Sequence, residues 1–113
     1  DVAAVRLTIQ GYLTAFADGD GASACALLTP ESQQQFLAAV RTEVAATTCA
    51  DAFSEVADQA PDALRSAFRD APVSDVVVTG NRARGVVTFA GRSNTVTLEK
   101  RQSQWMISNA PGS

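Results

Sequence analysis

Residues 75–89 read DVVVTGNRARGVVTF, and this stretch decides the fold. β-Branched residues are dense in it, and the spacing of apolar residues changes from three or four to two after Pro72. Gly80-Asn81 is typical of a two-residue hairpin turn between a strand at 75–79 and an antiparallel partner at 83–89. Two more alternating segments follow, at 94–99 and 104–108. The second half of the chain therefore predicts a meander of four antiparallel strands.

The first 70 residues have helical patterns instead. One apolar stripe recurs at three- and four-residue steps and consists of Val5, Ile9, Tyr12, Leu13 and Phe16. In Asp18-Gly19-Asp20, Gly19 is typical of a residue that ends a helix, and Asp20 is typical of the N-cap of a second helix. Thr29-Pro30 ends this second helix and begins a third. Thr48 suits the cap of a fourth helix, and Pro61 begins a last turn or two. We predict one α+β domain over residues 1–110, with N-terminal helices packed on one face of the sheet, and a tail at 111–113.

The alternation of the strands assigns side chains to the two faces of the predicted sheet. If Val96 and Leu98 point to the helices, six other residues share their face: Val76, Val78, Val87, Phe89, Trp105 and Ile107. The opposite face is neither fully polar nor fully apolar and carries Val77, Val86, Thr88, Thr95, Thr97 and Met106. Such a face either stays wet or pairs with a second copy across a two-fold axis, and we predict a homodimer through these six residues.

The composition argues against several classes of partner. The net charge of the 113-residue chain is −3 and its pI is about 4.7, so we expect no nucleic-acid partner. Arg82, Arg84 and Arg92 form the strongest basic cluster, which we interpret as a solvated strand edge. No apolar run approaches the roughly 20 residues that span a bilayer, so we expect no transmembrane segment.

Two cysteines and the absence of histidine constrain the chemistry further. Without histidine the commonest general base and metal ligand near neutral pH are missing, so we expect no metal site and no cofactor. Cys25 and Cys49 are either two buried thiols or one disulfide, and we favour the disulfide. Such a bond persists in an oxidising compartment, which predicts an extracytoplasmic protein, secreted or lipid-anchored, whose leader lies outside this chain.

Four segments resemble the nuclear transport factor 2-like superfamily, a cone-shaped α+β fold that includes ketosteroid isomerase, scytalone dehydratase and the polyketide cyclases. They are YLTAFADGD at 12–20, ACALLT at 24–29, LEK at 98–100 and QWMI at 104–107. The chain is similar in particular to small actinobacterial secreted or lipoprotein members, which often keep one cysteine in the second helix and another before the third or fourth. These motifs describe how a cone packs and not what it does.

The resemblance suggests one candidate catalytic residue, Tyr12, although we assign no catalytic residue and interpret Tyr12 as a packing aromatic with a satisfied hydroxyl. Tyr12 stands eight positions before Asp20, as the oxyanion-hole tyrosine of ketosteroid isomerase similarly precedes its own Gly-Asp, and such a hydroxyl polarises a carbonyl. The aspartate base of the isomerase has no counterpart after the second helix, where Glu31 is expected near an exposed helix start. Asp75, at a strand start, is the other candidate catalytic residue, although a carboxylate at such a position more often faces a turn.

Three functional hypotheses follow. The first is an extracytoplasmic, non-enzymatic domain that binds an apolar small molecule or a partner protein through the cone. Its pocket residues would be Tyr12, Phe16, Phe36, Phe89, Leu98 and Trp105. The second is an isomerase- or cyclase-like enzyme that uses Tyr12 with Asp75 or another pocket carboxylate. The third is a homodimeric structural module.

Overall fold

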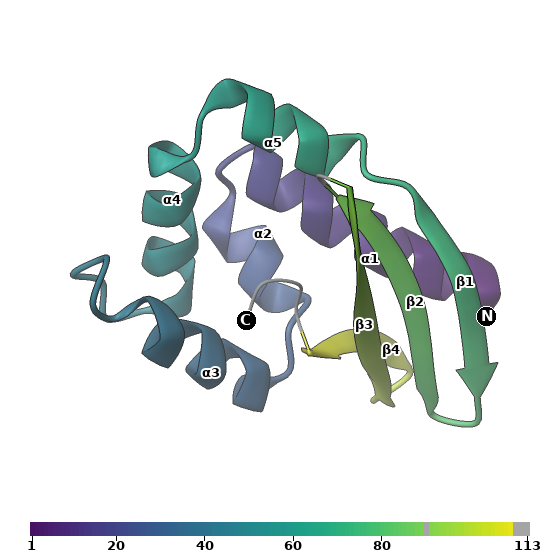
Figure 1. The fold of residues 1–113 in the computed structure, drawn as a ribbon. Coiled ribbons are helices and arrows are strands. Elements are labelled where there is room, and N and C mark those ends of the chain that lie inside the picture. The colour runs from purple at the N-terminus through teal and green to yellow at the C-terminus, as the bar shows by residue number, and fades with distance from the viewer. Residues whose placement is uncertain (90, 110–113) are drawn as a thin grey trace.

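The computed structural model describes residues 1–89 and 91–109, in which helices precede a single sheet (Figure 1). The helices are α1 (Val2–Ala17), α2 (Gly21–Ala26), α3 (Pro30–Val40), α4 (Cys49–Gln59) and α5 (Asp62–Arg69). The strands are β1 (Val73–Thr79), β2 (Arg82–Phe89), β3 (Arg92–Arg101) and β4 (Gln104–Asn109), paired antiparallel in the order β1-β2-β3-β4. The predicted α+β class with a four-stranded antiparallel meander is confirmed. The predicted tail at 111–113 lies outside the described residues.

Side-chain caps start three of the helices where the sequence predicts them. The side chains of Asp20, Thr29 and Thr48 accept hydrogen bonds from backbone N–H groups three residues later, at the beginnings of α2, α3 and α4. Gly19, with φ of 72°, supplies the left-handed residue between α1 and α2. These local signals set the helix boundaries, so the helical half forms where the pattern indicates.

The second helix is shorter than predicted. It ends at Ala26, and the chain then runs beside β4 as far as Thr29. The N–H of Ile107 donates to the carbonyl of Leu27 at 2.7 Å, and the N–H of Thr29 donates to the carbonyl of Ile107 at 3.0 Å. The segment leaves the helix because these two bonds satisfy backbone groups on the outer edge of β4.

The inner face of the sheet, which we define as the face toward α1, carries the core. In Figure 1, α1 crosses behind the strands. Val87, Val96, Leu98, Trp105 and Ile107 are each 5% exposed or less. These positions agree with the predicted register. The other predicted inner-face residues, Val76, Val78 and Phe89, are only half-buried, because β1 is an edge strand and Phe89 ends β2.

The strand β1 contains a bulge. Its pairing with β2 shifts between Ser74 and Val77, and Asp75 within the bulge has φ of 52°. Asp tolerates the left-handed region better than most residues. The bulge lets Val73 and Val78 both pair along β2, opposite Val87 and Ala83.

A disulfide joins α2 to α4. Cys25 in α2 is bonded to Cys49 at the start of α4, and their Cα atoms lie 6.1 Å apart. The disulfide prediction is therefore confirmed over the alternative of two buried thiols. Within residues 1–89 and 91–109, no helix has both the length and the apolar character needed to cross a membrane.

Candidate functional site

Six aromatic rings form one continuous chain of contacts that runs through the helical half of the molecule and ends at Phe89 of β2. All five phenylalanines of the sequence and its single tyrosine belong to it. Phe36 stacks on Phe53 with ring centroids 3.9 Å apart, and Phe68 stacks on Phe89 at 4.2 Å. Phe16 meets Phe53 at 6.4 Å and Phe68 at 4.6 Å, both edge to face, and so joins the two stacks. We call these residues, with Tyr12, the aromatic chain.

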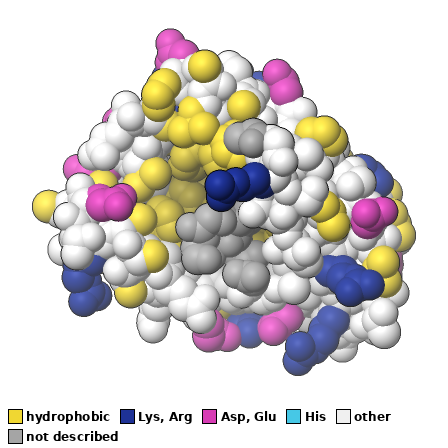
Figure 2. Space-filling view, viewed as in Figure 1, with side chains coloured by type: hydrophobic (Ala, Val, Ile, Leu, Met, Phe, Trp, Pro, Cys, Tyr) yellow, Lys and Arg dark blue, Asp and Glu magenta, His cyan; other side chains and the backbone are white. Residues whose placement is uncertain are grey.

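The aromatic chain reaches the surface at a hollow. Figure 2 shows hydrophobic side chains gathered in a recess between α4 and α5 and over α2. The segments around this recess carry hydrophobic residues that are half-buried and pack on the core: Leu27, Phe36, Val56, Phe68 and Ala71. Phe53, at 1% exposed, and Phe16, at 9%, lie beneath them. We call this feature the apolar hollow.

The structure divides the six predicted pocket residues into two groups. Tyr12, Phe16, Phe36 and Phe89 belong to the aromatic chain. Leu98 and Trp105 are buried in the core beneath the sheet at 1% and 5% exposed, and the Nζ atom of Lys100 lies 5.8 Å from the Trp105 ring centroid.

Two members of the aromatic chain are missing from the pocket prediction. They are Phe53 and Phe68, and each stacks on one ring and also contacts Phe16. The only sequence signal for them is their place on the apolar faces of the helices that follow Thr48 and Pro61.

Tyr12 is packed as a core residue. It is 4% exposed, and its ring meets Phe53 edge to face at 5.7 Å. Burial raises the pKa of the Tyr12 phenol well above its ordinary value, so the hydroxyl keeps its proton throughout the physiological range. Among the described residues, no hydrogen bond fixes that hydroxyl toward a partner.

Asp75, the other candidate catalytic residue, lies on the far side of the sheet from Tyr12. It is exposed in the β1 bulge and lines a small depression together with Val77, Arg84, Val86 and Thr95. That depression opens on the outer face, away from α1, whereas Tyr12 belongs to α1 itself. The structure therefore does not bring the two candidate catalytic residues into one site.

Three other carboxylates of the helical half, those of Asp18, Glu31 and Asp62, form ion pairs at the surface. Asp18 pairs with Arg69 at 2.6 Å, and Asp62 pairs with Arg65 at 2.5 Å. Hydrogen bonding from Arg101 lowers the pKa of the exposed Glu31 carboxyl, which places it as a charged surface group. In the described part of the chain, His, Cys, Asp and Glu do not form a group of three or more that could hold a metal ion.

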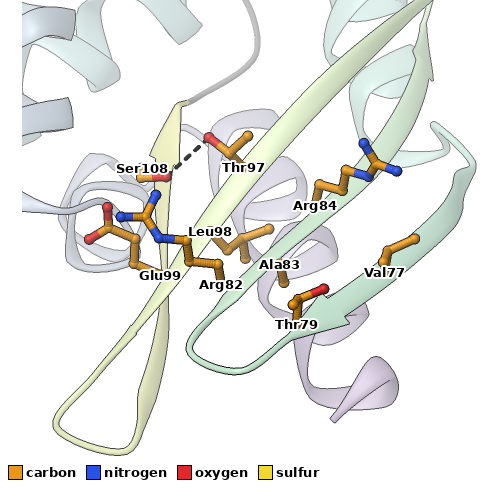
Figure 3. Close-up of a pocket in the computed structure, with 9 residues that line it drawn as sticks. All are labelled: Val77, Thr79, Arg82, Ala83, Arg84, Thr97, Leu98, Glu99 and Ser108. Carbon is orange, nitrogen blue, oxygen red and sulfur yellow. Dashed lines mark hydrogen bonds between the residues drawn. The ribbon is translucent and has the colours of Figure 1, made fainter.

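A second candidate site lies on the outer face of the sheet (Figure 3). It is a groove of about 400 Å³ that spans all four strands. We call it the outer groove, and its lining residues are Val77, Thr79, Arg82, Ala83, Arg84, Thr97, Leu98, Glu99 and Ser108. Its existence could not be predicted from the sequence, because it depends on how the four strands curve and which side chains extend.

The outer groove corrects the interpretation of the basic cluster. Arg82 and Arg84 do not lie at a strand edge, because β2 is an inner strand with β1 on one side and β3 on the other. Both side chains are exposed and stand on the outer face, opposite Glu99 and Thr97 of β3. Arg92 begins β3 and lies outside the groove lining.

Two of the six residues of the predicted dimer face, Val77 and Thr97, line this groove. Val77 is 43% exposed, Thr88 and Thr95 are exposed, and the other three, Val86, Thr97 and Met106, are half-buried. The homodimer stays a prediction.

A search of protein-family models finds no match to this sequence, and neither do searches of curated proteins and of solved structures. The resemblance to the nuclear transport factor 2-like superfamily stays a prediction. Function is therefore inferred from the chemistry of the apolar hollow and the outer groove.

Proposed function

We propose that this protein is a non-enzymatic, extracytoplasmic domain with a nuclear transport factor 2-like cone, and that it binds an uncharged apolar small molecule in the apolar hollow. The observation that carries the proposal is the aromatic chain, whose stacked pairs place Phe36 and Phe68 half-buried over the buried Phe16 and Phe53. Small-molecule sites are concave and mostly apolar, with aromatic walls. The apolar hollow has that character.

The distribution of polar groups supports binding without catalysis. Tyr12 and Asp75 lie on opposite sides of the sheet, and a carbonyl reaction needs its base within hydrogen-bond reach of the substrate. The Tyr12 phenol is buried in the core, and the described residues around it supply no base to act with it. Binding of an apolar ligand requires only a concave shape and apolar contacts, and the hollow has both.

The disulfide supports the extracytoplasmic part of the proposal. A bond between Cys25 and Cys49 persists where the surroundings are oxidising, and it ties α2 to α4 on one side of the hollow. Fixing those two helices keeps the recess open when no ligand is present, which lowers the entropy lost on binding.

The test is binding of N-phenyl-1-naphthylamine, a neutral apolar probe, followed by displacement with straight-chain alcohols and a sterol. We expect saturable probe fluorescence, displacement by at least one of these ligands, and a raised melting temperature of the protein in its presence. Phe36→Ala removes the half-buried member of one stack and should weaken probe binding about tenfold or more. Leu7→Ala is the matched control, because Leu7 is 67% exposed on α1, outside the aromatic chain, and its loss should leave binding unchanged.

A second variant distinguishes a loss of probe binding from a loss of folding. Val56→Phe adds bulk to a half-buried position on α4 without removing a core ring, and it should reduce the amount of probe bound while the melting temperature of the free protein stays close to that of the parent. If no apolar ligand binds the parent protein, the hollow is not a small-molecule site and the proposal is wrong.

A further inference from the structure

We propose that the outer groove binds a small organic dianion, a dicarboxylate with its two acidic groups separated by a short chain, between Arg82 and Arg84. The two arginines are alternate residues of β2 and therefore stand on the same face of the sheet. Figure 3 shows their side chains extending in different directions, that of Arg82 toward Glu99 and Ser108 and that of Arg84 away from them. The groove therefore has one guanidinium at each flank.

Neither guanidinium has a counter-ion among the described residues. Glu99 is the only acidic residue in the groove lining, and it lies opposite Arg82 in the strand register. Its Oε2 atom instead accepts from Nε and Nη2 of Arg101, at 3.0 and 2.8 Å. Because Arg101 also donates to Glu31 at 2.7 Å, the charge of Glu99 is held within a three-residue network at one end of the groove.

The groove also carries neutral hydrogen-bonding groups. Thr79, Thr97 and Ser108 line the groove, and the hydroxyls of Thr97 and Ser108 are hydrogen-bonded to each other at 3.0 Å. Each hydroxyl carries one donor and two acceptor positions, so this pair can still take part in a further hydrogen bond. Val77, 43% exposed, lies opposite Arg84 in the register and offers apolar contact at that side of the groove. A ligand with one charged group at each end of a short chain matches two separate guanidinium groups in a groove whose other lining residues, apart from Glu99, are neutral.

Carboxylates suit these cations because a guanidinium binds a carboxylate through two parallel N–H···O hydrogen bonds. A phosphate ion also binds guanidinium groups, but it carries its charge on one compact group and cannot reach two that point apart. A second copy of this chain is the less favoured occupant. A two-fold axis through the middle of this face would bring four guanidinium groups together, and like charges oppose association.

The experiment is an NMR titration of the arginine Nε–Hε signals of the full chain at constant ionic strength. The probes are dicarboxylates from succinate to pimelate, with butyrate as the monoanion and inorganic phosphate as the compact anion. We expect both Arg82 and Arg84 to respond and the dissociation constant to be lowest at one chain length. The best dicarboxylate should bind at least tenfold more tightly than butyrate or phosphate.

Three variants locate the site. Arg82→Gln and Arg84→Gln should each reduce the affinity for the best dicarboxylate about tenfold or more, to near that of butyrate. Arg92→Gln is the matched control, because Arg92 is exposed on the same sheet and outside the groove, and it should leave the affinity unchanged. All three side chains are exposed, so circular dichroism should show the same fold for each variant.

Several outcomes would overturn the assignment. Equal affinity for all anions, or an equal loss in all three variants, means nonspecific attraction to positive charge. Tighter binding of phosphate than of every dicarboxylate means that a single arginine does the binding. Tighter binding of a hexaglutamate peptide through the same two arginines assigns the groove to an acidic segment of a protein. A dimer in sedimentation that Val86→Glu dissociates, together with no dicarboxylate binding, assigns the face to a second copy.

Discussion

A Cβ atom added to Gly21 would stand 1.9 Å from the carbonyl oxygen of Ala50. Two non-bonded heavy atoms cannot lie so close together. The backbone of α2 can therefore approach the first turn of α4 this closely only because residue 21 has no side chain. The contact lies beside the Cys25–Cys49 disulfide, which joins the same two helices. Glycine and disulfide together therefore set the spacing between α2 and α4.

Replacement of this glycine tests the close approach. Gly21→Ala should lower the free energy of unfolding by about 3 kcal/mol, because the obstructing atoms are backbone and cannot move aside as a side-chain end could. Urea denaturation measures the loss. Gly11→Ala is the control: a Cβ there meets only Leu27 Cδ1 at 3.6 Å, an ordinary contact, so this substitution inside α1 should stabilise the protein by about 1 kcal/mol. Equal effects of the two substitutions would contradict the close approach.

The disulfide should account for a large part of the stability of the domain. Its cysteines are 24 residues apart, and the chain-entropy treatment of a loop of that size gives about 3.5 kcal/mol. We expect the Cys25→Ala/Cys49→Ala variant to unfold at a clearly lower urea concentration than the oxidised protein. The melting temperature of the parent protein should also fall when a reductant is added. An unchanged melting temperature in reductant would show that the bond does not support the fold.

The cap of α2 should depend on pH. Hydrogen bonds from the hydroxyl and then the backbone N–H of Ser23 lower the pKa of the exposed Asp20 carboxyl below its ordinary value of 3.8. Because the folded pKa is the lower one, the stabilisation by this cap is present above the ordinary value and is lost as the pH falls through the folded value.

Carboxyl NMR titration of Asp20 measures this directly. In Ser23→Ala the pKa of Asp20 should rise toward 3.8, although not all the way, because the backbone N–H remains as a donor. A pKa that does not change in this variant would assign the lowering to something other than the serine hydroxyl.

A second close contact involves Gly85 of β2 and Ile9 of α1. A Cβ on Gly85 would lie 2.9 Å from Ile9 Cδ1, the end of a flexible side chain. We expect Gly85→Ala to destabilise the protein by about 1 kcal/mol in the parent. The same substitution should be close to neutral in an Ile9→Val background, which lacks the Cδ1 atom. Thermal unfolding of the four members of this double-mutant cycle checks the coupling, and simple additivity would refute it.

Much of the fold could be predicted from local signals. The caps at Asp20, Thr29 and Thr48 and the turn at Gly80 depend on neighbouring residues alone, and they lie where the sequence indicates. The alternation in β3 also assigns Val96 to the buried face correctly. The bulge at Asp75 has no comparable local marker, since Asp is common both in turns and at strand ends.

The two candidate sites are harder to predict because they depend on contacts between distant segments. Phe53 and Phe68 join the aromatic chain only when α4 and α5 fold over α1. The error about Arg82 and Arg84 has a different cause, because a meander of four strands already places its second strand inside the sheet. The predicted strand order is therefore enough to place both arginines on an inner strand. It does not predict that their two side chains extend in different directions.

The bonds between Ile107 and the segment from Leu27 to Thr29 have a consequence for self-association. They occupy the free side of β4 at Ile107, so the hydrogen-bonding groups there cannot accept a strand from another molecule. Growth of a fibril from folded molecules by strand addition needs both edge strands of each sheet to be open, and the chain's own backbone covers β4 at Ile107. Polymers built through strand addition would first require the Leu27–Thr29 segment to detach.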